Sequence, residues 1–218
     1  MDVLTGSKSG YALGVQDPRL PLWFTPGGKG YAGIANGIDP SGSFFTTFKY
    51  SDYAEINIRT AKGFFYTNRD DITKSHLAYP LMDYSEVCFL QAEAALRGLI
   101  SGDVETYYQN GISASIKTVA KTSGVDLASD AISNYLAAVP KTTSASSKEA
   151  KLRLICTQEW VALFPNSQEA WTLLRRTGYP DFLVYPQFIN GSGLVSSGNW
   201  VQRLSYPNSE YENDADFI

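Results

Sequence analysis

Residues able to carry covalent or metal chemistry are scarce in this sequence. His76 is its single histidine, which removes most metal sites and most Ser–His or Cys–His catalysis. Cys88 and Cys156 are its two cysteines, and both lie in stretches with a helical pattern, so we interpret them as core thiols rather than a disulfide. The glycine-rich residues 26–30 (PGGKG) lack the spacing of a phosphate loop and are interpreted as a turn. The sequence therefore predicts no catalytic residue, no metal site and no cofactor.

Charged residues in the helical stretches have structural explanations. Glu93 is placed to pair with Arg97, four residues later on the same helix face. Arg175 and Arg176 are candidates for binding an anion, but basic side chains at the end of a helix also complement its macrodipole, and we favour that interpretation.

The chemistry that the sequence favours is stacking on aromatic rings. Rings are dense between positions 11 and 66, where closely spaced glycines prevent long helices, so some of them are expected on exposed loops. Flat rings beside Asn, Asp and Arg suit a neutral polar ligand such as a sugar, because C–H faces stack on the ring and polar groups bond the hydroxyls. The alternative is that most of these rings clamp the loops together as a core. The set comprises Tyr11, Trp23, Phe24, Tyr31, Phe44, Phe45, Phe48, Tyr50, Tyr53, Phe64, Phe65 and Tyr66.

Length and composition describe a folded globular chain. Its 218 residues are 44% hydrophobic and 18% charged. A chain of this length and composition can form a sizeable core without disulfides or bound metals. A net charge of -4 with no basic stripe argues against nucleic acid as a partner. The first residues (MDVLTGS) lack the basic and apolar parts of an export signal and a lipidated cysteine. We therefore expect either a cytoplasmic protein or a chain that begins downstream of its signal.

The periodicity predicts a mainly α fold organised in three parts. Residues 1–80 are loop-rich and aromatic-rich, with a candidate strand at 44–50; residues 81–178 form helical hairpins; residues 179–218 form an irregular C-terminal segment packed on them. Capping boxes that begin at Asp83, Ser146 and Asn166 mark helix starts, and Gly111 indicates close approach of another backbone. The predicted helices cover residues 84–98, 103–120, 126–139, 147–164 and 166–178.

Several motifs, in order along the chain, resemble the SusD/RagB-like nutrient-binding outer-membrane lipoproteins of Bacteroidetes. The longest are residues 84–98 (YSEVCFLQAEAALRG) and 107–115 (YYQNGISAS). The resemblance covers nearly all of this chain but only about half of such a protein, because the family's N-terminal half is missing. Ser205 stands where the family usually has proline. The supporting motifs are residues 17–20 (DPRL), 157–163 (TQEWVAL), 168–171 (QEAW) and 203–210 (RLSYPNSE).

The resemblance implies a tetratricopeptide-like helical scaffold and glycan binding at the cell surface without catalysis. Such proteins deliver oligosaccharides to a SusC-like TonB-dependent outer-membrane transporter, from an aromatic platform on loops outside the helices. Residues 1–80 would then be the ligand-binding subregion of one SusD-like domain, and the Glu and Arg residues of the motif helices would be structural. From ring chemistry and loop position, we predict that the stacking residues are Trp23, Tyr31, Tyr66 and Trp200.

Two other functions stay open on the sequence alone. The helices, notably residues 103–120, would bind a protein partner if the chain were a helical-repeat interaction scaffold. A glycoside hydrolase would need two suitably spaced carboxylates, for which loop residues such as Asp39 and Asp70 are the candidates.

Overall fold

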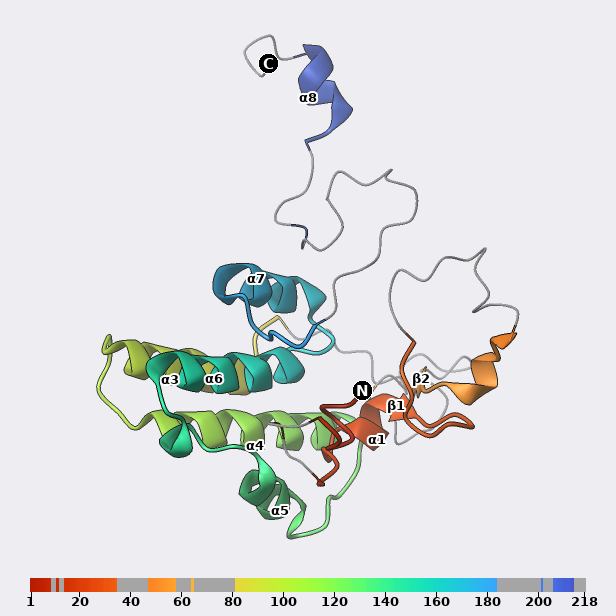
Figure 1. Ribbon diagram of the computed structural model, residues 1–218, viewed down its shortest axis with the longest axis horizontal. Coiled ribbons are helices and arrows are strands. Elements are labelled where there is room, and N and C mark those ends of the chain that lie inside the picture. Colours follow the sequence, from red (N-terminus) through yellow and green to blue (C-terminus); the bar gives the residue numbers. More distant parts are fainter. Residues whose placement is uncertain are drawn as a thin grey trace.

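The computed structural model describes residues 1–8, 11, 14–34, 47–57, 64, 81–183, 201 and 206–213. Its N-terminal elements are short, and its longer helices begin at residue 84 (Figure 1). In chain order the elements are α1 (Leu20–Trp23), β1 (Phe24–Thr25), the 3-10 turn η1 (Tyr50–Asp52), β2 (Glu55–Ile56), α3 (Tyr84–Arg97), α4 (Val104–Thr122), α5 (Ala131–Ala138), the 3-10 turn η3 (Thr142–Ser144), α6 (Lys148–Ala162), α7 (Ser167–Thr177) and α8 (Asn208–Asn213).

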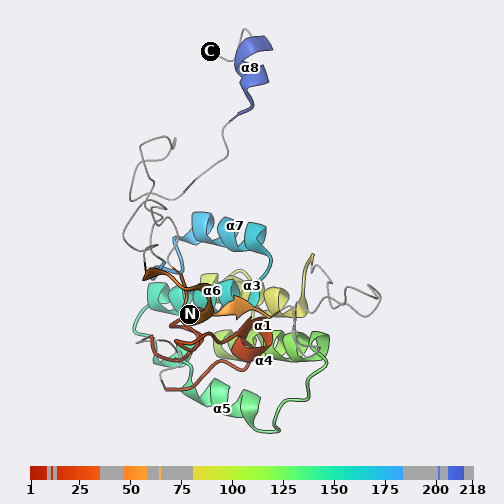
Figure 2. The ribbon, with the colours of Figure 1, turned by 90° about the vertical axis from the view of Figure 1, so that its right-hand side faces the viewer.

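The longer helices stack in layers, which confirms the mainly α fold. α3 and α4 form an antiparallel hairpin, and α6 packs against both. Figures 1 and 2 show α5 on the outer side of α4, while α7 lies on the opposite side of the stack, over α6. No helix within the described ranges is long and apolar enough to cross a membrane.

Helix starts are capped close to the predicted positions, with Ser147 rather than Ser146 as the cap of α6. The side chains of Asp83, Asp103, Ser147 and Asn166 each accept a hydrogen bond from a backbone N–H in the first turn of the helix that follows. These bonds satisfy donors that a helix start would otherwise leave unpaired. Gly98 ends α3 with a φ of 80°, a left-handed conformation that glycine adopts without steric cost.

Two expected elements differ from the structure. The helix predicted at 126–139 begins only at Ala131, because the preceding segment is irregular and packs Leu127 against the core. Of the strand predicted at 44–50, the described residues from Thr47 onward are not strand, and Tyr50 begins η1 instead. The aromatic, β-branched composition of this stretch favours a strand, but the chain forms a local turn at residues 50–52 instead.

The main core fills the space between α3, α4, α5 and α6. Gly111 on α4 faces the Phe89 ring of α3 so closely that a Cβ built there would lie 2.8 Å from Phe89 Cζ. The expectation of another backbone beside Gly111 is therefore wrong, because the close neighbour is the Phe89 side chain. The buried members of this core are Phe89, Ala92, Tyr108, Ile112, Ile116, Tyr135, Val139 and Ile155.

A buried ion pair ties the N-terminal segment to this core. Arg19 and Asp17 are both fully buried, and the guanidinium donates to both carboxylate oxygens at 2.9 and 2.6 Å. Arg19 also donates to Ser115 Oγ on α4 at 2.8 Å and to Gln158 Oε1 on α6 at 3.4 Å. Its guanidinium carbon lies 6.0 Å from the ring centre of Tyr135 on α5. One side chain therefore contacts three helices of the scaffold.

We expect Asp17→Asn to lower the free energy of unfolding by about 3–5 kcal/mol, because it leaves the Arg19 charge buried without its counter-ion. Asp52→Asn is the matched control, since Asp52 is partly exposed and pairs with the exposed Lys29 at 3.3 Å. That change should cost at most about 1 kcal/mol. Urea denaturation of the two variants measures the difference, and equal losses would contradict the assigned role of Arg19.

Candidate functional site

Three aromatic rings gather on the loop around η1. Phe48 and Tyr53 stack with ring centres 5.2 Å apart and planes inclined by 22°. Tyr50 meets Phe48 edge to face at 4.5 Å, and its side chain is 74% exposed. We call Phe48, Tyr50 and Tyr53 the aromatic platform.

The glycine-rich turn at residues 26–30 holds this platform in place. Gly28 N–H donates to Ser51 O at 2.7 Å, and Lys29 N–H donates to Asp52 O at 2.9 Å. A Cβ at Gly27 would lie 2.4 Å from Tyr53 O, so only glycine allows the turn to approach the platform backbone. The turn predicted from the sequence thus exists, and it packs directly against the platform residues.

Charged groups lie at the edge of the platform. Lys29 Nζ lies 3.3 Å from Asp52 Oδ2 and 5.2 Å from the ring centre of Tyr53. A ring surface with an exposed tyrosine and a polar edge can stack on the C–H face of a sugar and bond its hydroxyls.

The predicted stacking residues fall in different places. The Trp23 side chain is only 1% exposed and packs edge to face on Phe164 at 5.1 Å, so the expectation of an exposed ring there is wrong. Tyr31 is half-buried, and burial raises its pKa. It lies next to Ala32, whose carbonyl accepts a hydrogen bond from Ala54 N–H at 2.9 Å, so its backbone adjoins the platform loop. Outside the described residues lie Tyr66, Trp200, Asp39 and Asp70.

Tyr50 and Tyr53 belong to the aromatic set but are not among the predicted stacking residues. The signal in the sequence is the spacing Phe48, Tyr50, Tyr53 around the polar pair Ser51 and Asp52. Polar residues at the centre of a tight turn put the flanking rings on a loop surface.

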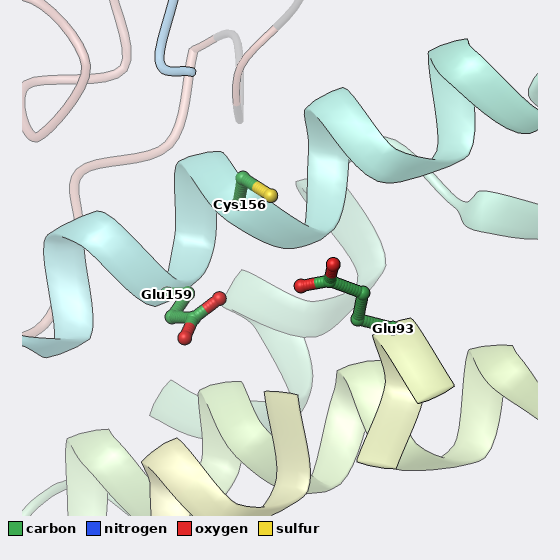
Figure 3. Close-up of side chains that lie close together, drawn as sticks. All are labelled: Glu93, Cys156 and Glu159. Atoms are coloured by element: carbon green, nitrogen blue, oxygen red, sulfur yellow. The ribbon is translucent and has the colours of Figure 1, made fainter. Parts of the chain in front are cut away.

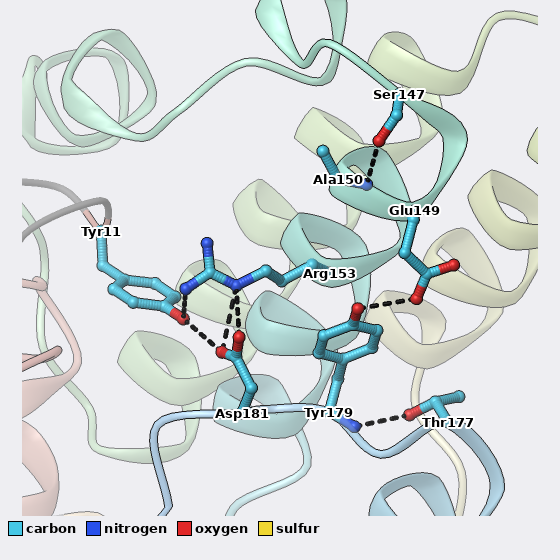
Figure 4. A network of polar contacts seen from close by, with 8 residues as sticks. All are labelled: Tyr11, Ser147, Glu149, Ala150, Arg153, Thr177, Tyr179 and Asp181. Atoms are coloured by element: carbon cyan, nitrogen blue, oxygen red, sulfur yellow. Dashed lines mark hydrogen bonds and ion pairs between the residues drawn. The ribbon is translucent and has the colours of Figure 1, made fainter.

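A second polar network joins the N-terminal segment to α6 and to the chain after α7 (Figure 4). Arg153 Nε donates to both Asp181 carboxylate oxygens at 3.0 and 2.9 Å, and its Nη2 donates to Tyr11 Oη at 3.1 Å. Tyr11 is buried, and this burial raises the pKa of its hydroxyl. Because each of these groups is hydrogen-bonded within the network, we assign the network to holding the three segments together.

Glu93 on α3 is the centre of a third polar group. Its carboxylate accepts from Arg97 at 2.8 Å, which confirms the predicted i,i+4 pair, and from Arg176 on α7 at 2.6 and 2.8 Å. Burial alone would raise the pKa of Glu93, but the hydrogen bonds from Arg176 and Arg97 outweigh it and lower that pKa. Arg176 therefore bridges α7 to the hairpin, which is the structural role favoured over anion binding.

Potential metal ligands converge beside this group. Among the described residues, Glu93, Cys156 and Glu159 have ligand atoms that all lie within 4.8 Å of one another. Cys88 and Cys156 are both buried and free, as predicted.

A cleft of about 350 Å³ lies between the start of α3, the second half of α4 and the end of α6. Phe64, Tyr84 and Phe164 provide its rings, and Thr118 and Thr122 provide hydroxyls. Tyr84 is 66% exposed at the rim. The Asp83 carboxylate, also at the rim, is occupied as the N-cap of α3.

Solved structures with the same fold are SusD homologues. One from Bacteroides thetaiotaomicron has 26% identity and a TM-score of 0.65, with 92% of this chain and 43% of that chain covered. A chitin-binding SusD homologue from Flavobacterium johnsoniae has 28% identity and a TM-score of 0.62, with 90% and 41% covered. A further structure, described as a chitin-binding protein, has 26% identity and a TM-score of 0.69, with 92% and 42% covered. The chain thus spans about two fifths of the length of these relatives.

A search of curated proteins finds no match. The family model described as "SusD-like: Susd and RagB outer membrane lipoprotein" matches residues 7–217, almost the whole chain. The longest motifs of the sequence resemblance, residues 84–98 and 107–115, lie on α3 and α4 of the helical scaffold. The chain therefore belongs to the SusD-like family.

Proposed function

We propose that this chain binds a glycan on its aromatic platform. The observation that carries the proposal is the exposed Tyr50 ring beside the stacked pair Phe48 and Tyr53, on a loop that is hydrogen-bonded to the glycine-rich turn. Two relatives of similar fold are described as chitin-binding, which makes oligomers of N-acetylglucosamine the first ligand to test.

The proposed mode of binding is stacking with a polar edge. A pyranose ring lays its C–H face on Tyr50, and its hydroxyls exchange hydrogen bonds with Lys29 and Asp52. The function is retention of the glycan rather than its cleavage, since hydrolysis requires two carboxyls on either side of the scissile bond. Asp52 lies at the edge of the platform, and Lys29 already pairs with it.

The proposal includes a place and a partner. The family description as outer-membrane lipoproteins supports a position at the bacterial cell surface. There the chain hands its glycan to a SusC-like TonB-dependent transporter. No nucleic acid is part of this function, in line with the acidic net charge.

Removal of the two platform tyrosines should weaken glycan binding. We expect Tyr50→Ala to cost roughly 1–3 kcal/mol of binding free energy, the range for a base stacked on an aromatic side chain. Tyr53→Ala should cost less, because Tyr53 stacks on Phe48 rather than on the sugar. Affinity electrophoresis against chitin oligomers and a panel of plant, host and microbial polysaccharides measures retardation, and a reducing-sugar assay on the same samples measures cleavage.

Tyr84→Ala is the matched control, because it removes a similarly exposed tyrosine on α3 at the rim of the cleft. Its retardation should equal that of the unmodified chain. Loss of binding in Tyr84→Ala with full binding in Tyr50→Ala would place the site in the cleft and refute the platform. Release of reducing ends would refute the non-enzymatic role.

The glycine turn offers a second test that leaves every ring in place. Gly27→Ala should reduce glycan affinity, since its Cβ collides with Tyr53 O at 2.4 Å and pushes the platform backbone away. Gly28→Ala is the control, because its Cβ would find its nearest neighbour, Asp52 Oδ1, at 3.4 Å, an ordinary contact. Far-ultraviolet circular dichroism should be the same for both. Equal affinities of the two variants would show that the turn does not position the site.

A further inference from the structure

Three side chains with metal-binding atoms meet between α3 and α6. Cys156 and Glu159 are three residues apart on α6, so they lie on one side of that helix, and Glu93 faces them from α3 (Figure 3). Their ligand atoms lie within 4.8 Å of one another, and all three side chains are buried.

The buried Glu159 carboxylate is the feature that indicates a ligand. Its side chain is only 3% exposed, and Oε2 has no hydrogen-bond partner among the described residues. A buried carboxylate oxygen with no partner is costly, and native structures normally satisfy such atoms. The Glu159 carboxylate belongs to the same cluster as Cys156 and Glu93.

Glu93 is already oriented in the way that metal-binding carboxylates usually are. Arg97 and Arg176 donate to its two oxygens at 2.6 to 2.8 Å. Carboxylates that bind metals are commonly fixed by such outer hydrogen bonds, which leave further lone pairs on the oxygens.

We propose that Glu93, Cys156 and Glu159 form a binding site for one divalent cation of the zinc type. A thiolate with two carboxylates favours Zn²⁺ and related thiophilic ions over Ca²⁺ and Mg²⁺, which take oxygen ligands. Tetrahedral zinc bonds of about 2.0–2.3 Å place neighbouring ligand atoms about 3.3–3.8 Å apart. The present atoms lie within 4.8 Å of one another, so binding requires the cluster to contract. Three protein ligands leave a fourth position for water.

Binding of one such ion converts the Cys156 thiol to its thiolate, and the Sγ proton passes to solvent. The charged groups around Glu159 are Glu93 and Glu86 on α3 and Arg176 and Glu169 on α7.

Cobalt is the probe, since Co²⁺ occupies zinc sites and gives an ultraviolet charge-transfer band only when a thiolate is bound. Titration of the purified, metal-free 218-residue chain should produce this band with saturation at one equivalent, and Zn²⁺ should displace it. Cys156→Ala should abolish the band, and Glu159→Gln should weaken binding by more than the roughly 10–100-fold expected for loss of an outer-shell group. Cys88→Ala is the matched control, because it removes the other buried thiol and should leave the band intact.

The spectrum of the unmodified chain decides the question even if a variant fails to fold. Absence of the charge-transfer band at saturating Co²⁺, or weak binding at several equivalents, would overturn the site, as would a band that survives Cys156→Ala. Zn²⁺ should also raise the melting temperature of the unmodified chain, because it binds the folded state. The platform and its glycan binding involve none of these residues, so either result leaves that proposal intact.

Discussion

The buried ion pair between Arg19 and Asp17 is the interaction on which the arrangement of the chain depends. Charge in a protein interior is tolerated only when it is paired and fully hydrogen-bonded, and Asp17, Ser115 and Gln158 meet that requirement from three different parts of the sequence. Because Asp17 and Arg19 precede α1 directly, the pair fixes where the N-terminal segment enters the stack of helices. A purely apolar contact would fix the position of the N-terminal segment less precisely, since charged hydrogen bonds specify direction as well as distance.

This anchoring extends from the core to the loop that carries the rings. α1 runs straight into β1, which pairs with β2 through Phe24 and Ile56, while Trp23 O accepts a hydrogen bond from Asn57 N–H. The platform loop therefore starts and ends at a short sheet that is continuous with the anchored segment. Binding groups on loops gain precision when a rigid scaffold holds both ends of the loop.

The parts of this structure that follow local rules could be predicted, and those that depend on distant contacts could not. Caps such as Asp83 and Asn166 predict the helix starts because their partners lie two or three residues away. Trp23 shows the opposite case: ring content alone does not distinguish a core indole from a binding surface, and Phe164, which covers it, lies far along the chain. Glu93 likewise lies close to Cys156 and Glu159 only because α3 packs on α6, and no local sequence pattern predicts that packing.

The contact between Gly111 and Phe89 has a consequence for how this sequence can diverge. As long as a phenyl ring lies against α4, position 111 accepts no side chain, although alanine would otherwise favour the helix there. A smaller residue at position 89 would remove this steric clash. The two positions are therefore expected to show sign epistasis. Gly111→Ala should destabilise the fold when residue 89 is Phe and stabilise it when residue 89 is smaller. The order in which the two substitutions occur then decides whether a mutational path is open.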